Sequence, residues 1–478
     1  MKKILVLILL SVILISAFPV SGSAVSIPDI EHESESALVY CVESGQMLYS
    51  RNPDEPLYPT ALTKLMTAYL ASKHAKTLED GYNTLVTMSP TAYYSTSGND
   101  IEISINEEMS IYNLLVGLIL AGANDCANML AEEVSGSIED FVVLMNQTAK
   151  ELGMNDTYYT NPTGMHEDDM VTTANDMLKL CLHIRSETTI TEIAACKTIV
   201  IPPTNKREQR AIGTRNFLVS ERTTQDYYLP IASGLIYGET TAGGPAIAST
   251  ASHNGKNYIC ILLGGTTIVY VDKEEIIETD ENGDYVFNDD GTPVILQERE
   301  THSVNYCLLE ARKLLKWADD SFSFIKAIDK STPICEIPVK LAKNIDSVAL
   351  IPKEPIEIFV PADLDRKRDI LIEYELDQDV LYAPVQAGQV VGRVSLTYLG
   401  DFIGEVPLVV DATVEQNTIL VILNSIWRIC NTPFMRVALG ALIIGSLAYI
   451  IITAVDRGKR KKAAKRKYIK ENEIKYLK

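Results

Sequence analysis

Residues 59–70, PTALTKLMTAYL, place a lysine one turn into an apolar helix. The amine of Lys64 lies on the same helix face as the side chain three residues earlier. A neutral lysine there can take the proton of a serine hydroxyl and make it a nucleophile for acyl transfer. Residue 61 is alanine, and the methyl group of Ala61 cannot attack a carbonyl. The segment therefore predicts the base of an acyl-transfer site without its nucleophile.

Thr60 is the nearest hydroxyl that could replace the absent nucleophile. It precedes Lys64 by four residues, which is also about one helical turn. Its alternative role is an N-cap after Pro59, with the hydroxyl bonded to the backbone amide near Thr63. We favour the cap for Thr60, because the sequence shows no base geometry for it, and we assign Thr63 a structural role as well.

The remaining polar and sulfur-containing residues give little support to metal or cofactor chemistry. His166 is a single histidine among loop carboxylates in HEDDM, which is a weak metal signal, and we interpret it as a solvated turn residue. The eight cysteines contain no C-x-x-C pair. Most lie in apolar runs and are predicted to be buried free thiols, although a Cys181–Cys196 disulfide is possible in an exported chain. We expect neither a metal nor a cofactor.

Strands are expected at the beginning and the end of the region around Lys64, with helices between them. This order predicts an antiparallel sheet with helices packed on it, within a domain that spans residues 28–325. The alternation and the turn residues predict strands on both sides of 43–45, at 196–202, and on both sides of 253–255. The apolar periodicity predicts helices over 61–75, 110–122, 124–136, 137–153, 172–185 and 304–322.

Two later segments differ in character from this domain. Residues 271–300 are acidic and carry two turn signals, Asn282-Gly283 and Asp290-Gly291, which fit either a surface hairpin insertion or a disordered loop. Residues 333–413 consist of short alternating runs broken by proline and glycine. We therefore predict a C-terminal all-β module, a small sandwich.

Both ends of the chain predict export and membrane attachment. Residues 1–24 join two lysines, an apolar run and a small-residue site, which is typical of a cleaved signal peptide; an uncleaved anchor is the alternative. Residues 437–455 hold no charge over 19 residues, enough for one transmembrane helix. Residues 414–436 form a juxtamembrane segment that could lie in the interface. The basic tail, 456–478, predicts a single-pass protein in the cell membrane with a cytoplasmic tail and an extracytoplasmic ectodomain.

The charge of the ectodomain excludes nucleic-acid binding. The whole chain of 478 residues has a formal net charge of −20. Without Lys2, Lys3 and the tail, which holds eleven basic and three acidic residues, 30 basic and 60 acidic residues remain. Such an acidic surface does not bind a phosphate backbone. We expect the basic tail to lie against anionic membrane lipid.

Long stretches of the chain resemble the serine-type D-Ala-D-Ala carboxypeptidases, the low-molecular-weight penicillin-binding proteins. The resemblance covers residues 36 to about 415. It is carried by residues 38–71, 114–165 with its Asn-Pro-Thr-Gly turn, TTANDM, GTRNFLV, 232–265 and 379–396. It implies an α/β (α+β) penicillin-binding/β-lactamase-like transpeptidase fold, followed by the C-terminal β-sandwich.

The resemblance also implies where the family's reactive residues fall, and there this chain departs from the pattern. Ala61 corresponds to the nucleophilic serine, whereas its activating lysine is kept as Lys64. In the Ser-x-Asn motif, Gly122 replaces the serine and Asn124 is kept. The Lys-Thr-Gly motif, which implies substrate binding, reads Ile236, Tyr237 and Gly238.

These substitutions predict a family member at the cell-wall face that has lost hydrolytic activity. It would bind peptidoglycan peptides, or a cell-wall protein partner, in the remnant cleft. The alternative is an active carboxypeptidase that removes the terminal D-Ala of peptidoglycan peptides with Thr60 as an atypical nucleophile. Under the first interpretation Lys64 pairs with Asn124 or with a backbone carbonyl, because a buried lysine needs a partner.

Overall fold

The computed structural model describes residues 26–221, 227–273, 276–280, 283–289, 291–297 and 300–475. The predicted signal segment, residues 1–24, lies outside these ranges. The described chain divides into two compact units. One contains residues 26–324 and 359–364, and the other contains residues 325–358 and 365–475.

The first unit is built on a five-stranded antiparallel sheet with the strand order β2-β1-β9-β8-β7. Its strands are β1 (Ser36–Cys41), β2 (Gln46–Arg51), β7 (Ala232–Thr240), β8 (Gly244–His253) and β9 (Lys256–Leu263). The Asn254-Gly255 turn joins β8 to β9, as the sequence predicts, with positive φ at both residues. β7 is an edge strand, so one side of its backbone is free to pair.

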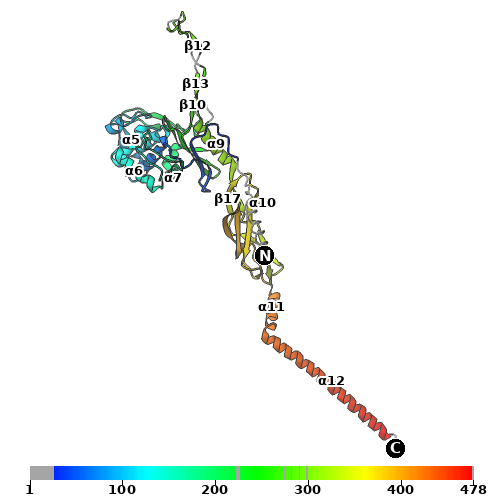
Figure 1. The fold of residues 1–478 in the computed structure, drawn as a ribbon. Coiled ribbons are helices and arrows are strands. Elements are labelled where there is room, and N and C mark those ends of the chain that lie inside the picture. The colour runs from blue at the N-terminus through cyan, green and yellow to red at the C-terminus, as the bar shows by residue number, and fades with distance from the viewer. Residues whose placement is uncertain are drawn as a thin grey trace, which may run out of the picture. The chain divides into compact units, whose positions relative to one another are not determined.

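Helices cover both faces of this sheet. The helices of the unit are α2 (Thr63–Ala75), α3 (Pro90–Tyr94), α4 (Ile111–Val116), α5 (Asn124–Ser135), α6 (Ile138–Glu151), α7 (Ala174–Ile184), α8 (Thr188–Ala194) and α9 (Tyr306–Ser321), with short turns η1 (Thr60–Leu62), η2 (Gly81–Asn83) and η3 (Gly117–Ala121). Figure 1 shows α5, α6 and α7 together, with α9 apart from them. Side chains alternate along β9: Ile259 and Ile261 join the core of the main helical layer, whereas Tyr258 and Cys260 join the core under α9.

Local signals account for most of these elements. Ser137 caps α6, because its hydroxyl accepts the amide of Asp140. The predicted helix over 110–122 is α4 followed by the π-helical turn η3. All eight cysteines are unpaired thiols, so Cys181 and Cys196 form no disulfide.

Small antiparallel pairs complete the first unit. They are β3 (Leu85–Thr87) with β4 (Glu108–Ser110), β5 (Thr198–Ile201) with β6 (Arg210–Gly213), β10 (Thr267–Lys273) with β13 (Glu300–Asn305), and β11 (Ile276–Ile277) with β12 (Ile295–Gln297). The last two pairs include residues near both ends of the acidic segment 271–300, and isolated bridges join Thr279 to Tyr285 and Phe287 to Pro293, so the described residues of the segment form a β-ribbon (Figure 1).

The second unit contains a β-module and two C-terminal helices. Its six-stranded sheet has the order β18-β20-β21-β16-β15-β19. The remaining elements of the chain are β14 (Phe322–Ile328), β15 (Cys335–Lys340), β16 (Ser347–Pro352), β17 (Ile356–Pro361), α10 (Arg366–Asp369), β18 (Ile370–Leu376), β19 (Leu381–Tyr382), β20 (Val390–Tyr398), β21 (Asp401–Val410), α11 (Thr418–Cys430) and α12 (Pro433–Lys475). Among the described residues, α12 is the one helix long and apolar enough to cross a membrane, over Pro433–Ile469.

Candidate active site

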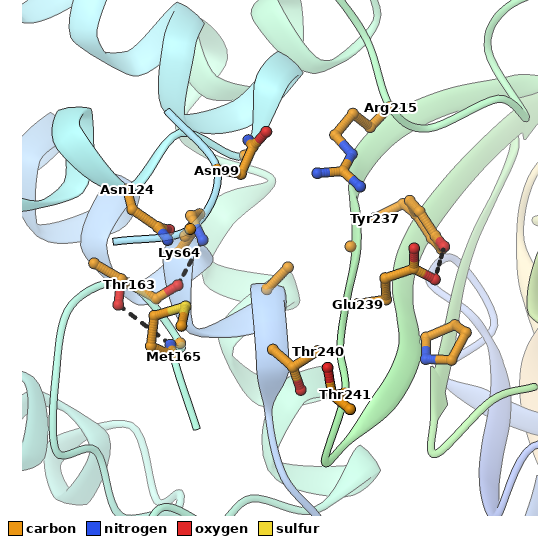
Figure 2. Close-up of a pocket in the computed structure, with 16 residues that line it drawn as sticks. Lys64, Asn99, Asn124, Thr163, Met165, Arg215, Tyr237, Glu239, Thr240 and Thr241 are labelled. Atoms are coloured by element: carbon orange, nitrogen blue, oxygen red, sulfur yellow. Dashed lines mark hydrogen bonds between the residues drawn. The ribbon is translucent and has the colours of Figure 1, made fainter. Parts of the chain in front are cut away.

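A cavity of about 470 Å³ lies in the first unit, between the edge strand β7 and the main helical layer. Segments far apart in the sequence form its walls. The lining residues are Ala61, Lys64, Gly98, Asn99, Gly122, Asn124, Thr163, Gly164, Met165, Arg215, Tyr237, Gly238, Glu239, Thr240, Thr241 and Pro245. Six of the seven predicted site residues are therefore brought together (Figure 2).

Ala61 contributes only a methyl group to this cavity. It lies in η1, where the amide of Leu62 donates to the carbonyl of Pro59. A Cβ added to Gly238 would be 2.5 Å from the Cβ of Ala61, so the backbone of β7 lies directly against this position. Glycine is therefore required at residue 238, even though residue 61, which it contacts, carries no hydroxyl.

The predicted capping role of Thr60 is wrong. The chain enters α2 through the 3₁₀ turn η1, and the carbonyl of Thr60 accepts the amide of Thr63, so the helix needs no side-chain cap. Thr60 has φ of +47° and is 1% exposed. Its hydroxyl has no hydrogen-bond partner among the described residues, and Thr60 does not line the cavity. Its methyl group points toward Gly243 instead.

Lys64 is buried and donates from Nζ to the backbone oxygen of Thr163 at 2.5 Å. The partner is thus a carbonyl and not Asn124. Burial and, secondly, the positive charge of Arg215 lower the pKa of Lys64 from 10.5 to about 7. A substantial fraction of the amine is therefore neutral near pH 7, which is the form a general base requires.

The Asn-Pro-Thr-Gly turn holds the Lys64 partner in place. The side-chain oxygen of Asn161 accepts the amides of Thr163 and Gly164. The hydroxyl of Thr67 donates to the carbonyl of Pro162 at 2.7 Å, which fixes the turn to α2. A Cβ on Gly164 would overlap the carbonyl oxygen of Thr60, so only glycine fits there.

Asn124 and Gly122 form the wall that faces β7. Asn124 donates from Nδ2 to the carbonyl of Ser97 at 2.6 Å. Its Oδ1 is buried and has no partner within the described part of the chain, so it can accept a hydrogen bond from a ligand. Gly122 has φ of +69° at the end of η3, where a side chain would be strained.

The third predicted motif divides between two sides of β7. Ile236 is 1% exposed in the core of the main helical layer, so this predicted substrate-binding residue does not line the cavity. Tyr237 lies on the opposite face of the strand, because side chains alternate along it. Its hydroxyl donates to Glu239 Oε2 at 3.0 Å and accepts from Asn305 Nδ2 at 2.5 Å. Burial raises the pKa of Tyr237.

Sequence reasoning missed two charged residues of the cavity, Arg215 and Glu239. Arg215 is held by its amide, which donates to the carbonyl of Leu120 at 2.9 Å. Figure 2 shows its side chain reaching the cavity from the β7 side, across from Lys64 and Asn124. A single arginine in a loop belongs to no helical or strand pattern, so periodicity could not identify it as a site residue. Its position in GTRNFLV, a segment that resembles the family, was the one sequence feature that pointed to Arg215. Glu239 directly follows Gly238.

His166, outside this cavity, is a partly exposed turn residue. It packs edge-on against the ring of Tyr58 and lies 3.4 Å from Asp168. No group of three or more metal-binding side chains occurs in the described part of the chain.

The fold is that of the penicillin-binding proteins. The sequence profile described as D-alanyl-D-alanine carboxypeptidase matches residues 22–267. The profile of the penicillin-binding protein 5 C-terminal domain matches residues 322–416. The chain belongs to the D-alanyl-D-alanine carboxypeptidase family.

Individual relatives match over most of their length. D-alanyl-D-alanine carboxypeptidase DacF of Bacillus subtilis is 25% identical over 415 residues, which cover 85% of this chain and 93% of the relative. D-alanyl-D-alanine carboxypeptidase DacA of Haemophilus influenzae is 26% identical over 400 residues, which cover 80% of this chain and 86% of the relative. Among solved structures, penicillin-binding protein 5 of Haemophilus influenzae has a TM-score of 0.52 at 23% identity and covers 82% of this chain and 100% of that chain. Penicillin-binding protein 6B of Escherichia coli has a TM-score of 0.54 at 21% identity and covers 82% of this chain and 98% of that chain. These structures share the fold.

Proposed function

We propose that this protein binds the carboxyl-terminal end of peptidoglycan peptides at the cell-wall face and does not hydrolyse them. The observation that carries the proposal is the methyl group of Ala61 beside Lys64, where an acyl-transfer site needs a hydroxyl. Loss of the serine nucleophile costs about 10⁶ in turnover in subtilisin. That corresponds to roughly 8 kcal/mol of barrier.

Thr60 does not supply the missing nucleophile in this proposal. Its hydroxyl is buried outside the cavity, and rotating its backbone would break the η1 turn that starts α2. Lys64 keeps the lowered pKa of a base, but it donates to a carbonyl and has no hydroxyl to activate.

Three features of the cavity support peptide binding. Arg215 presents a guanidinium without an ion pair among the described residues, and this group binds carboxylates in a bidentate manner. The unpartnered Oδ1 of Asn124 can accept a peptide amide. The free edge of β7 can add an extended peptide as a further strand. Together they fit a peptide that ends in a free carboxylate.

The C-terminal helices support attachment to the membrane. The apolar stretch within α12 is long enough to span the hydrocarbon core, and the basic residues that follow it favour a cytoplasmic tail. Trp427 on α11 is 63% exposed and suits the interface, in line with a juxtamembrane role. We therefore propose a single-pass protein whose cavity faces the cell wall.

The test uses the full-length protein in detergent. One sample is incubated with a labelled penicillin and analysed by mass spectrometry, and a second is assayed for D-Ala release from a peptide ending in D-Ala-D-Ala. We expect neither an adduct nor released D-Ala. Fluorescence anisotropy should detect binding of the same peptide and a loss of about tenfold when its carboxylate is amidated, because a charge-assisted bond of about 1.4 kcal/mol disappears.

Arg215→Gln is the matched variant for this binding measurement. It should lower the affinity for the free acid to that for the amide and leave the affinity for the amide unchanged. A covalent penicillin adduct, or D-Ala release that Thr60→Val abolishes, would contradict the proposal. Equal binding of acid and amide would remove the assigned role of Arg215.

A further inference from the structure

Two opposite charges line the cavity without pairing with each other. The guanidinium of Arg215 and the carboxylate of Glu239 both contribute to its wall on the β7 side (Figure 2). Among the described residues neither side chain forms an ion pair. Lys64 is turned to the carbonyl of Thr163, so it does not neutralise Glu239 either. The cavity therefore offers one positive and one negative group to a ligand.

Neutral donors hold the carboxylate of Glu239 in its orientation. Tyr237 donates to Oε2 at 3.0 Å, and the hydroxyl of Thr267 lies at 3.5 Å from the same oxygen. Tyr237 is itself fixed by Asn305, whose Nδ2 also donates to the Thr267 hydroxyl at 3.2 Å. Hydroxyl groups orient a carboxylate but leave its charge uncompensated. Arg215 lies on the same wall but forms no ion pair with Glu239, so the carboxylate can still bind a cationic group of a ligand.

We propose that the cavity selects peptides that carry a free primary ammonium group in addition to the terminal carboxylate, with Glu239 as the residue that recognises the ammonium. The inference rests on the proposed peptide binding and specifies its ligand. In peptidoglycan, a diamino acid near the peptide terminus carries such an amine until cross-linking converts it into a neutral amide. The protein would thus distinguish peptides that are not yet cross-linked from those that are.

The experiment compares two peptides ending in Lys-D-Ala-D-Ala, both labelled at the amino terminus. One has a free side-chain amine, and the other has this amine acetylated. Binding to the full-length protein in detergent is measured by fluorescence anisotropy. The free amine should bind about threefold tighter, the range for an exposed ion pair, and the preference should shrink at high salt.

Variants test whether Glu239 is responsible for the preference for the free amine. Glu239→Gln should bind both peptides equally, at the level of the acetylated peptide. Tyr237→Phe removes a donor that orients Glu239 and should give an intermediate preference. Glu139→Gln removes the same charge from the exposed first turn of α6 and should keep the full preference, which controls for net charge.

The possible negative results distinguish failure of this inference from failure of the proposed function. If both peptides bind wild-type protein equally, or if Glu239→Gln keeps the preference, this inference is wrong and the proposed peptide binding stands. If neither peptide binds, the proposed function and this inference are both wrong.

Discussion

The Cβ of Ala61 lies so close to the backbone of Gly238 that a Cβ on the glycine would be only 2.5 Å away. The edge strand β7 therefore still approaches the start of α2 as closely as a glycine allows. Lys64, one turn further on, keeps a lowered pKa. The scaffold that would position a nucleophile is thus present around a residue that cannot be one.

Restoring the hydroxyl should restore part of the chemistry. Ala61→Ser puts an oxygen on the cavity side of η1, within one turn of an amine whose pKa is about 7. We expect slow covalent labelling by penicillin in this variant, detected as a mass increase of the intact protein. Wild-type protein and Ala61→Ser/Lys64→Met should stay unlabelled. An unmodified Ala61→Ser protein would contradict the prediction.

Lys64 should make the stability of the first unit depend on pH. Its pKa is about 7 in the folded protein against the ordinary value of 10.5, so unfolding takes up a proton between these values. Wild-type stability should rise as the pH increases from about 7 toward 10, since the buried amine is then neutral. Below pH 7 the cost of the buried charge is fully present.

Lys64→Met removes this contribution. Melting temperatures measured by intrinsic fluorescence between pH 6 and 10 should show the variant favoured at low pH, with the difference shrinking as the pH rises. A difference that does not change with pH would mean that Lys64 is not titrating in this range.

The hydroxyl of Thr60 should be dispensable for folding. It is buried without a partner, and an unmade hydrogen bond of that kind costs about 1–3 kcal/mol. Thr60→Val should therefore be as stable as wild type or slightly more stable. The matched control is Thr67→Val, which removes a 2.7 Å bond to the carbonyl of Pro162 and should cost about 1–3 kcal/mol. Denaturation midpoints of the two variants and wild type measure these differences in stability. A clear loss of stability in Thr60→Val would mean that the Thr60 hydroxyl has a hydrogen-bond partner.

The glycine of the Asn-Pro-Thr-Gly turn should tolerate no side chain. Gly164 has φ of +74°, and its added Cβ would overlap the Thr60 carbonyl. Gly136 has φ of +81° with nothing within 4 Å, so Gly136→Ala should cost only the backbone strain of about 1–2 kcal/mol. Gly164→Ala should cost at least about 3 kcal/mol, because η1 must also move. Similar melting temperatures for the two variants would argue against this packing.

Local chemistry made much of the fold predictable from the sequence. The Asn254-Gly255 turn, the Ser137 cap and the alternation of β1 each depend on neighbours within a few residues. The six cavity positions were predictable for a different reason, because long matching segments align them with a family whose motifs converge on one site.

What the sequence by itself determined is therefore the order of strands and helices and the absence of a hydroxyl at residue 61. Tertiary structure alone decided that Thr60 needs no capping role, that Ile236 faces the core, and that Arg215 and Glu239 line the same cavity. The physical reason is that these outcomes depend on contacts between segments distant in sequence. The packing of the helices on the sheet decides which face of β7 is buried against them and which loop lies at its edge. The sequence pattern of β7 alone does not decide this.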